Sequence, residues 1–172
     1  NEAKPGDILK VEIKNIEVDN QAVMIAAPAE GVIGDRVEDS TTKIMKIKED
    51  CLLFNDIKLP LNPMIGVIGT APAEDEIPNG TPDSHGGNMD CKRITGGTTL
   101  YLPVEVEGGL LSLGDLHSVM GDGEIVVCGA EVRGRVNLKV DLLKGVKLPL
   151  PLLEDDKRVI TIASAETLDQ AA

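Results

Sequence analysis

Apolar and polar residues alternate along most of this chain, and this pattern predicts β-strands. The clearest stretch is 130–142, whose apolar positions are Ala130, Val132, Val136, Leu138, Val140 and Leu142. The same alternation runs through 9–13. At Asn15 its phase slips by one residue, which predicts a β-bulge that keeps both apolar sets on the core.

Turn residues divide the remaining strands. Asp19-Asn20 predicts a hairpin turn with a returning strand over 22–27, and Asn55-Asp56 predicts the tip of a tight hairpin over 52–59. The apolar run 64–69 is short enough for a fully buried strand. Ser164 is typical of a helix cap near the end of the chain. Many short strands with Gly and Pro turns favour a mainly β fold, either a sandwich or a barrel.

The two histidines of the sequence lie in separate glycine-rich runs, His85 in Ser84–Asp90 and His117 in Gly114–Glu124. Their neighbours are glycines and carboxylates rather than apolar residues. This predicts loops in which side chains converge on a ligand. The first run ends a long segment without periodicity, 73–90. An extended stretch, 98–106, separates the runs, so strand pairing would bring the two loops together.

Composition narrows the classes of partner. The formal net charge of −12 argues against binding of nucleic acid and against docking on anionic membranes. No apolar run approaches the length of about 18 residues that a membrane helix needs. The three cysteines, Cys51, Cys91 and Cys128, have neither metal-ligand nor redox spacing. We therefore expect free thiols and a cytoplasmic protein.

The candidate chemistry is a divalent metal site. Imidazole and carboxylate ligands together suit zinc, whereas a carboxylate and carbonyl subset suits calcium. The alternative is that a Gly-Asp-Gly run is only a hairpin turn. Cys91 is better explained as a small apolar filler than as a nucleophile, because no paired base is identifiable. The candidates are His85, Asp90, Asp115, His117, Asp122 and Glu124.

Three of these stretches together resemble the acetamidase/formamidase family. They are His85–Asp90, Gly97–Val104 and Gly114–Glu124, and the stretches Pro5–Leu9 and Gly66–Pro72 match the same family in the same order. The resemblance implies hydrolysis of short aliphatic amides to a carboxylic acid and ammonia, with a bound divalent metal. It also implies a β-sandwich or jelly-roll-like core with some added α structure, and a homodimer or higher homo-oligomer.

The resemblance covers nearly the whole chain, so we expect residues 1–172 to form a single acetamidase/formamidase-like domain. Family members begin earlier and continue further, and we expect this chain to be their central portion. The N- and C-terminal segments would then be absent or supplied as separate chains.

We expect Asp90 and His117 to be metal ligands, with Asp115 or Asp122 next. Glu124 is the expected general base, because it ends the glycine-hinged run. His85 is expected either as a ligand or as a donor that polarises the carbonyl. Two alternatives stay open. The first is a non-catalytic β-sandwich binding module stabilised by structural calcium. The second is an inactive central fragment that folds only with the missing ends.

Overall fold

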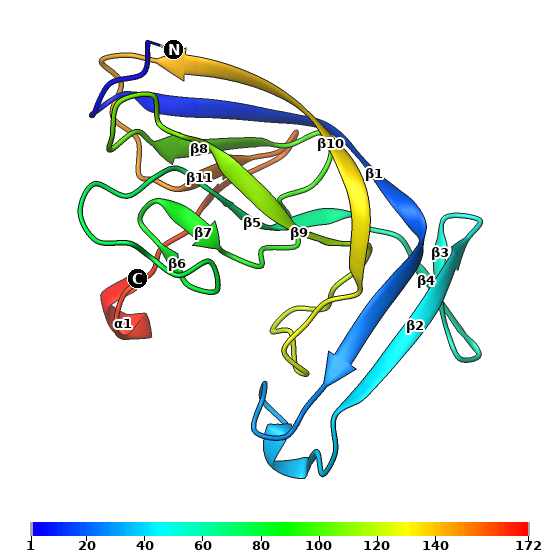
Figure 1. Cartoon of the computed structure of the whole chain (residues 1–172). Coiled ribbons are helices and arrows are strands. Elements are labelled where there is room, and N and C mark those ends of the chain that lie inside the picture. The colour runs from blue at the N-terminus through cyan, green and yellow to red at the C-terminus, as the bar shows by residue number, and fades with distance from the viewer. Residues whose placement is uncertain (1, 172) are drawn as a thin grey trace.

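The computed structural model describes residues 2–171, and within this range the protein is mainly β, as the sequence predicts (Figure 1). Helical structure there consists of a short 3-10 turn, Gly34–Arg36, and one α-helical turn, α1 (Leu168–Ala171). The strands are β1 (Ile8–Ala26), β2 (Thr41–Lys48), β3 (Cys51–Phe54), β4 (Ile57–Pro60), β5 (Met64–Gly69), β6 (Pro82–Asp83), β7 (Gly86–Asn88), β8 (Thr99–Pro103), β9 (Ser112–His117), β10 (Glu131–Leu143), β11 (Leu152–Glu154) and β12 (Val159–Thr161).

Antiparallel pairing joins these strands into one continuous sheet. Its main path runs β12-β11-β8-β1-β10-β9-β5-β7-β6. The far half of β1 also pairs with β2, which leads to the β3–β4 hairpin. Figure 1 shows β1 and β10 running together along the molecule and then separating. Beyond that point, the far half of β1 forms an arm with β2, β3 and β4 beside the main body.

β1 is one strand of 19 residues, so the hairpin predicted at Asp19-Asn20 is wrong. β10 pairs with β1 along most of its length. The polar pair is absorbed by a register shift between Val18 and Ala22 instead of reversing the chain. The bulge predicted at Asn15 is confirmed by a register shift between Ile13 and Asn15. A continuous partner strand therefore overrides the local turn signal.

Of three other local predictions, two are confirmed and one is wrong. The chain turns at Asn55-Asp56 between β3 and β4, with Asn55 at a φ of 53°. β5 is almost entirely buried. Ser164 is not the helix cap, because α1 begins later and Thr167 caps it, with the Thr167 hydroxyl accepting from the Gln170 amide.

Two hydrophobic clusters stabilise the fold. In the larger one, Val11 of β1, Leu100 of β8 and Ile65 of β5 are fully buried together, although β5 pairs with neither of the other two strands. The sheet therefore bends back over itself in a sandwich-like way. The smaller cluster packs the arm and contains Ala22, Met45, Leu52 and Ala130. Among the described residues, no helix is long or apolar enough to span a membrane.

Replacement of Ile65 by alanine tests the packing of the sandwich. Ile65 is fully buried, so Ile65→Ala should lower the free energy of unfolding by about 2–5 kcal/mol. The matched control is Ile57→Ala on β4, where the side chain is 57% exposed and the loss should stay below about 1 kcal/mol. Urea denaturation measures both, and equal losses would contradict a core centred on β5.

Candidate metal centre

His117 is the centre of the site. It ends β9, where it pairs with Met64 of β5 on one side and with Glu131 of β10 on the other. Its side chain is fully buried. The loop predicted around this histidine is therefore wrong, because pairing on both sides extends β9 through His117.

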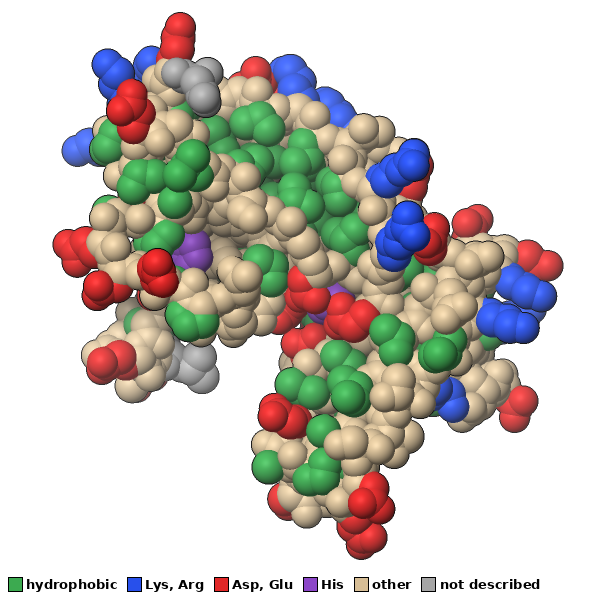
Figure 2. Space-filling view, in the orientation of Figure 1, with side chains coloured by type: hydrophobic (Ala, Val, Ile, Leu, Met, Phe, Trp, Pro, Cys, Tyr) green, Lys and Arg blue, Asp and Glu red, His purple; other side chains and the backbone are tan. Residues whose placement is uncertain are grey.

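Three carboxylates face the imidazole Nε2 atom. Glu131 Oε1 lies 3.1 Å away, Asp115 Oδ2 3.4 Å and Asp90 Oδ1 4.0 Å. Asp90 belongs to the first glycine-rich run, and Asp115 and His117 belong to the second. The predicted convergence of the two runs on one place is confirmed by these distances. Figure 2 shows one of the two histidines beside a group of carboxylates at the junction between the main body and the arm.

The backbone allows this crowding at two glycines. A Cβ atom on Gly66 of β5 would lie 2.3 Å from Asp115 Oδ2 and 2.7 Å from Asp90 Oδ1. A Cβ atom on Gly129 would lie 2.5 Å from His117 Nδ1. Any side chain at either position would displace the cluster.

Three of the clustered carboxylates are carried by left-handed backbone. Asp90, Asp115 and Glu124 have φ values of 41°, 56° and 42°. This conformation is uncommon for residues with a Cβ atom and costs on the order of 1–3 kcal/mol at each position. Such strain concentrates at functional sites, and here it turns three acidic side chains toward one imidazole.

The carboxylates determine the charge of His117. Burial alone lowers its pKa, but the neighbouring Asp115 and Glu131 carboxylates outweigh burial and raise the pKa of His117 to about 10. The contact with His117 in turn lowers the pKa of Asp115, against the effect of burial. These opposite shifts show that the carboxylates favour positive charge at Nε2, and a divalent cation bound there would take the place of the proton.

The other two carboxyl groups shift in the opposite direction. Burial raises the pKa of Asp90, and the charge of Asp115 adds to this rise. Burial, together with the nearby charge of Asp90, raises the pKa of Glu124 to about 7. These acids repel one another when ionised, so a cation between them would relieve the repulsion.

The donor atoms fit a metal ion. Among residues 2–171, Asp90 Oδ1 and His117 Nε2 are buried and lack a hydrogen-bond partner. Two sets of three groups each place one ligand atom per residue within 4.8 Å of one another. One set is Asp90, Asp115 and His117, and the other is His117, Glu124 and Glu131. Nitrogen and carboxylate donors together suit a borderline divalent ion.

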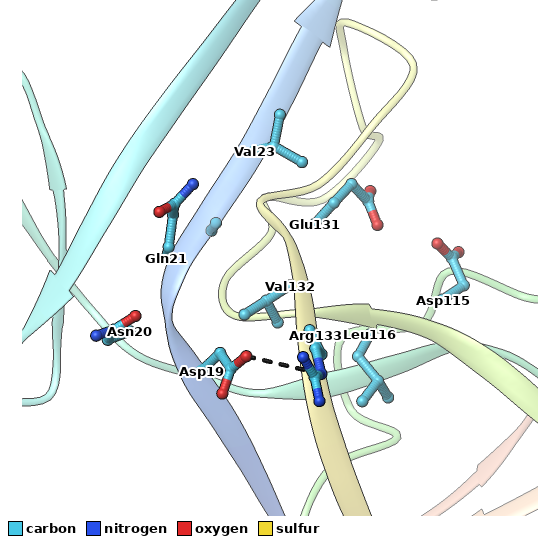
Figure 3. A pocket seen from close by; sticks show the side chains of 10 residues that line it. Asp19, Asn20, Gln21, Val23, Asp115, Leu116, Glu131, Val132 and Arg133 are labelled. Atoms are coloured by element: carbon cyan, nitrogen blue, oxygen red, sulfur yellow. Dashed lines mark ion pairs between the residues drawn. The ribbon is translucent and has the colours of Figure 1, made fainter.

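Glu131 is the member of the cluster that sequence reasoning missed. It begins β10, where it reads as one of the polar positions that alternate along an exposed strand face. Its carboxylate instead accepts a hydrogen bond from the Gly129 amide at 3.1 Å and faces His117. Figure 3 shows the Asp115 and Glu131 side chains along one side of a cavity of about 540 Å³, on the side away from Asp19. Its role follows from its direct register with His117 in the β9–β10 pairing, which the sequence alone does not show.

Two of the predicted site residues lie outside the cluster. The Asp122 side chain is 82% exposed, because its loop directs it to solvent. There it pairs with Lys92 at 2.7 Å instead of joining the cluster. His85 is buried beside Gly69 and Gly87, just before β7. Gly69 is three residues along β5 from Gly66, which corresponds to roughly 10 Å of extended strand. His85 Nδ1 is buried without a partner in the described part of the chain.

Comparisons with known proteins agree on one family. Residues 76–157 match the sequence model of the Acetamidase/Formamidase family. A formamidase from Methylophilus methylotrophus is 54% identical over 68 residues, which make up 38% of this chain and 17% of that protein.

Solved structures extend the likeness to nearly the whole chain. The crystal structure of an acetamidase from Bacillus halodurans has 55% sequence identity and a TM-score of 0.96, over 99% of this chain and 58% of that one. A crystal structure described as a predicted acetamidase/formamidase, from Thermoanaerobacter tengcongensis, has 50% identity and a TM-score of 0.95, over 98% of this chain and 56% of that one. This chain therefore spans somewhat more than half the length of these structural relatives.

Replacement of Gly66 tests whether the cluster holds a cation. Gly66→Ala should push Asp90 and Asp115 apart and lower the affinity for Zn²⁺ about tenfold or more. Gly114→Ala on the adjacent β9 is the matched control, because a Cβ atom there meets nothing within 4 Å. Isothermal titration with Zn²⁺ measures both variants. Equal affinities in the two variants would argue against a cation between Asp90 and Asp115.

Proposed function

Because this chain belongs to the acetamidase/formamidase family, we propose that it carries the metal centre of an amidase. The proposed reaction is hydrolysis of short aliphatic amides, such as formamide and acetamide, to a carboxylic acid and ammonia. The observation that supports it best is the buried His117 Nε2 atom, which faces acidic side chains and has no hydrogen-bond partner among the described residues.

The proposed cofactor is a divalent cation held by Asp90, Asp115 and His117. Glu131 lies close enough to complete the ligand set or to fix the imidazole. The mixed nitrogen and oxygen donors favour zinc, and calcium is the alternative if only the oxygens bind. When bound, such a cation supplies Lewis-acid activation of water and of the amide carbonyl.

Glu124 is the proposed general base. Its carboxylate lies within 4.8 Å of ligand atoms of His117 and Glu131, in the set that does not include Asp90 and Asp115. From there it would take the proton of the attacking water and donate a proton to the departing nitrogen, which leaves as ammonia. A base near neutral pKa is suited to both steps. His85 lies away from these groups and has no step in this proposal.

We also propose that the protein works in the cytoplasm as a homodimer or higher homo-oligomer. Cys51, Cys91 and Cys128 are free thiols, which fits a reducing compartment. An apolar surface on the arm supports assembly. There Val23 of β1 pairs with Ile44 of β2, and both side chains are exposed, as is Ile25 two residues on.

Removal of the cation should destabilise the protein, because the carboxylates would then repel one another. We compare protein kept at a free metal concentration of about a hundred times the Kd with protein whose metal a chelator has removed. The chelator-treated protein should melt about 5–10 °C lower. Calorimetry with and without the chelator measures the shift, and added Zn²⁺ should reverse it. An unchanged midpoint, with metal loss verified by elemental analysis, would count against this metal site.

Glu124→Gln separates the base from the ligands. This change keeps the size of the side chain but prevents it from accepting the proton, so ammonia release should fall on the order of 100-fold or more while metal content stays constant. Asp90→Asn should instead lower metal content together with activity. Glu76→Gln, at an exposed position, is the control for loss of a carboxylate.

The assay requires full-length protein, because this chain spans only part of its relatives. Ammonia release from formamide and acetamide is followed together with metal stoichiometry. Near-normal turnover by Glu124→Gln would remove Glu124 from the base role. A fully metal-loaded wild-type protein that releases no ammonia from any short amide would overturn the amidase proposal.

A further inference from the structure

A second cavity adjoins the metal centre. It encloses about 430 Å³ and shares Asp115 with the cluster. Val67 and Leu113 give it a small apolar wall, and Asn88 gives it a carboxamide. The cavity therefore combines access to the acidic centre with room for a short acyl chain.

Strand pairing fixes the backbone of Asn88 at the wall of this cavity. It ends β7 and pairs with Val67 of β5, and Val67 pairs with Gly114 of β9. The three residues form a row across adjacent strands, one position along β5 from Gly66, which lies beneath the cluster.

The hydrogen bonds of Asn88 are incomplete. Its Nδ2 atom donates to the Gly80 carbonyl at 3.5 Å, a long contact. Its Oδ1 atom is buried and has no partner within residues 2–171. A buried acceptor without a donor is unfavourable, so such atoms normally have a partner in the working state of a protein.

We propose that Asn88 recognises the N–H group of a primary carboxamide. This inference rests on the proposed amidase function. A primary amide presents a carbonyl oxygen and two N–H donors. With the carbonyl turned toward the metal centre, an N–H directed at Asn88 Oδ1 supplies the donor that this oxygen lacks. The substrate class is then unsubstituted amides with a short acyl group against Val67 and Leu113.

The same contact favours release of the product. Hydrolysis converts the amide into a carboxylate, which has no N–H and brings a negative oxygen to the place of the donor. Asn88 Oδ1 would then face a second acceptor, so the acid should bind more weakly than the amide. Asn88 is thus a specificity-determining residue and not a metal ligand.

The test uses full-length, metal-loaded protein and the variant Asn88→Ala. The KM for acetamide should rise about tenfold with a smaller change in kcat, because a hydrogen bond to the substrate is lost. The preference of the wild type for acetamide over N-methylacetamide should shrink, and metal content should not change. Asn137→Ala, at an exposed position on β10, is the matched control and should alter none of these quantities.

A binding measurement separates this proposal from the amidase proposal. In a Glu124→Gln background, NMR titration with acetamide and acetate gives affinities without turnover, and Asn88→Ala should weaken only acetamide. Asn88→Ser serves if the alanine variant does not fold. Loss of metal in an Asn88 variant would show that Asn88 acts through the metal centre rather than on the substrate, and unchanged KM and amide preference would show that Oδ1 is satisfied elsewhere. Either result overturns the proposal. If the metal-loaded wild type released no ammonia, acetamide binding that depends on Asn88 would still support this proposal, and only the amidase activity would be refuted.

Discussion

Several carboxylates surround one fully buried imidazole, and much of the local structure follows from that arrangement. Acidic groups crowded together in a partly dry environment repel one another unless positive charge compensates them. The carboxylates favour positive charge at His117, which is why its pKa rises although it is buried, and a cation bound to Nε2 would supply that charge in place of a proton. Repulsion also remains between Asp90 and Glu124, whose pKa values both rise. This imbalance is the physical reason to place a cation there.

Neighbouring strands of the sheet carry most of the candidate ligands. β9 carries Asp115 and His117, β10 begins with Glu131, and β5 passes beneath them at Gly66. The loops contribute only Asp90 and Glu124. Side chains on paired strands are held in more precise positions than side chains on free loops, so this cluster is suited to hold its acidic groups close together.

The sequence predicted much of the site because its signals were local. Asp115 and His117 are two residues apart, a spacing that predicts both side chains on one face of an extended strand. The structure does bring them together with Asp90, although Asp115 itself has left-handed backbone. Glu131 was hidden because its role depends on the register between β9 and β10, which no local pattern reveals. The same limit explains why the hairpin predicted at Asp19-Asn20 is wrong. Pairing with β10 keeps β1 continuous there, and this pairing is not visible in the local sequence. For Asp122, the side chain points to Lys92 and solvent, a direction that residue type and spacing do not determine.

The long β1 strand has a consequence for how the protein unfolds. Val11 of this strand belongs to the larger hydrophobic cluster, and Ala22 of the same strand belongs to the cluster in the arm. Both clusters are therefore tied to a single hydrogen-bonded ladder with β10, which also carries Glu131. Loss of either cluster frays that ladder and loosens the other. The body and the arm should melt in one cooperative transition rather than as two independent units.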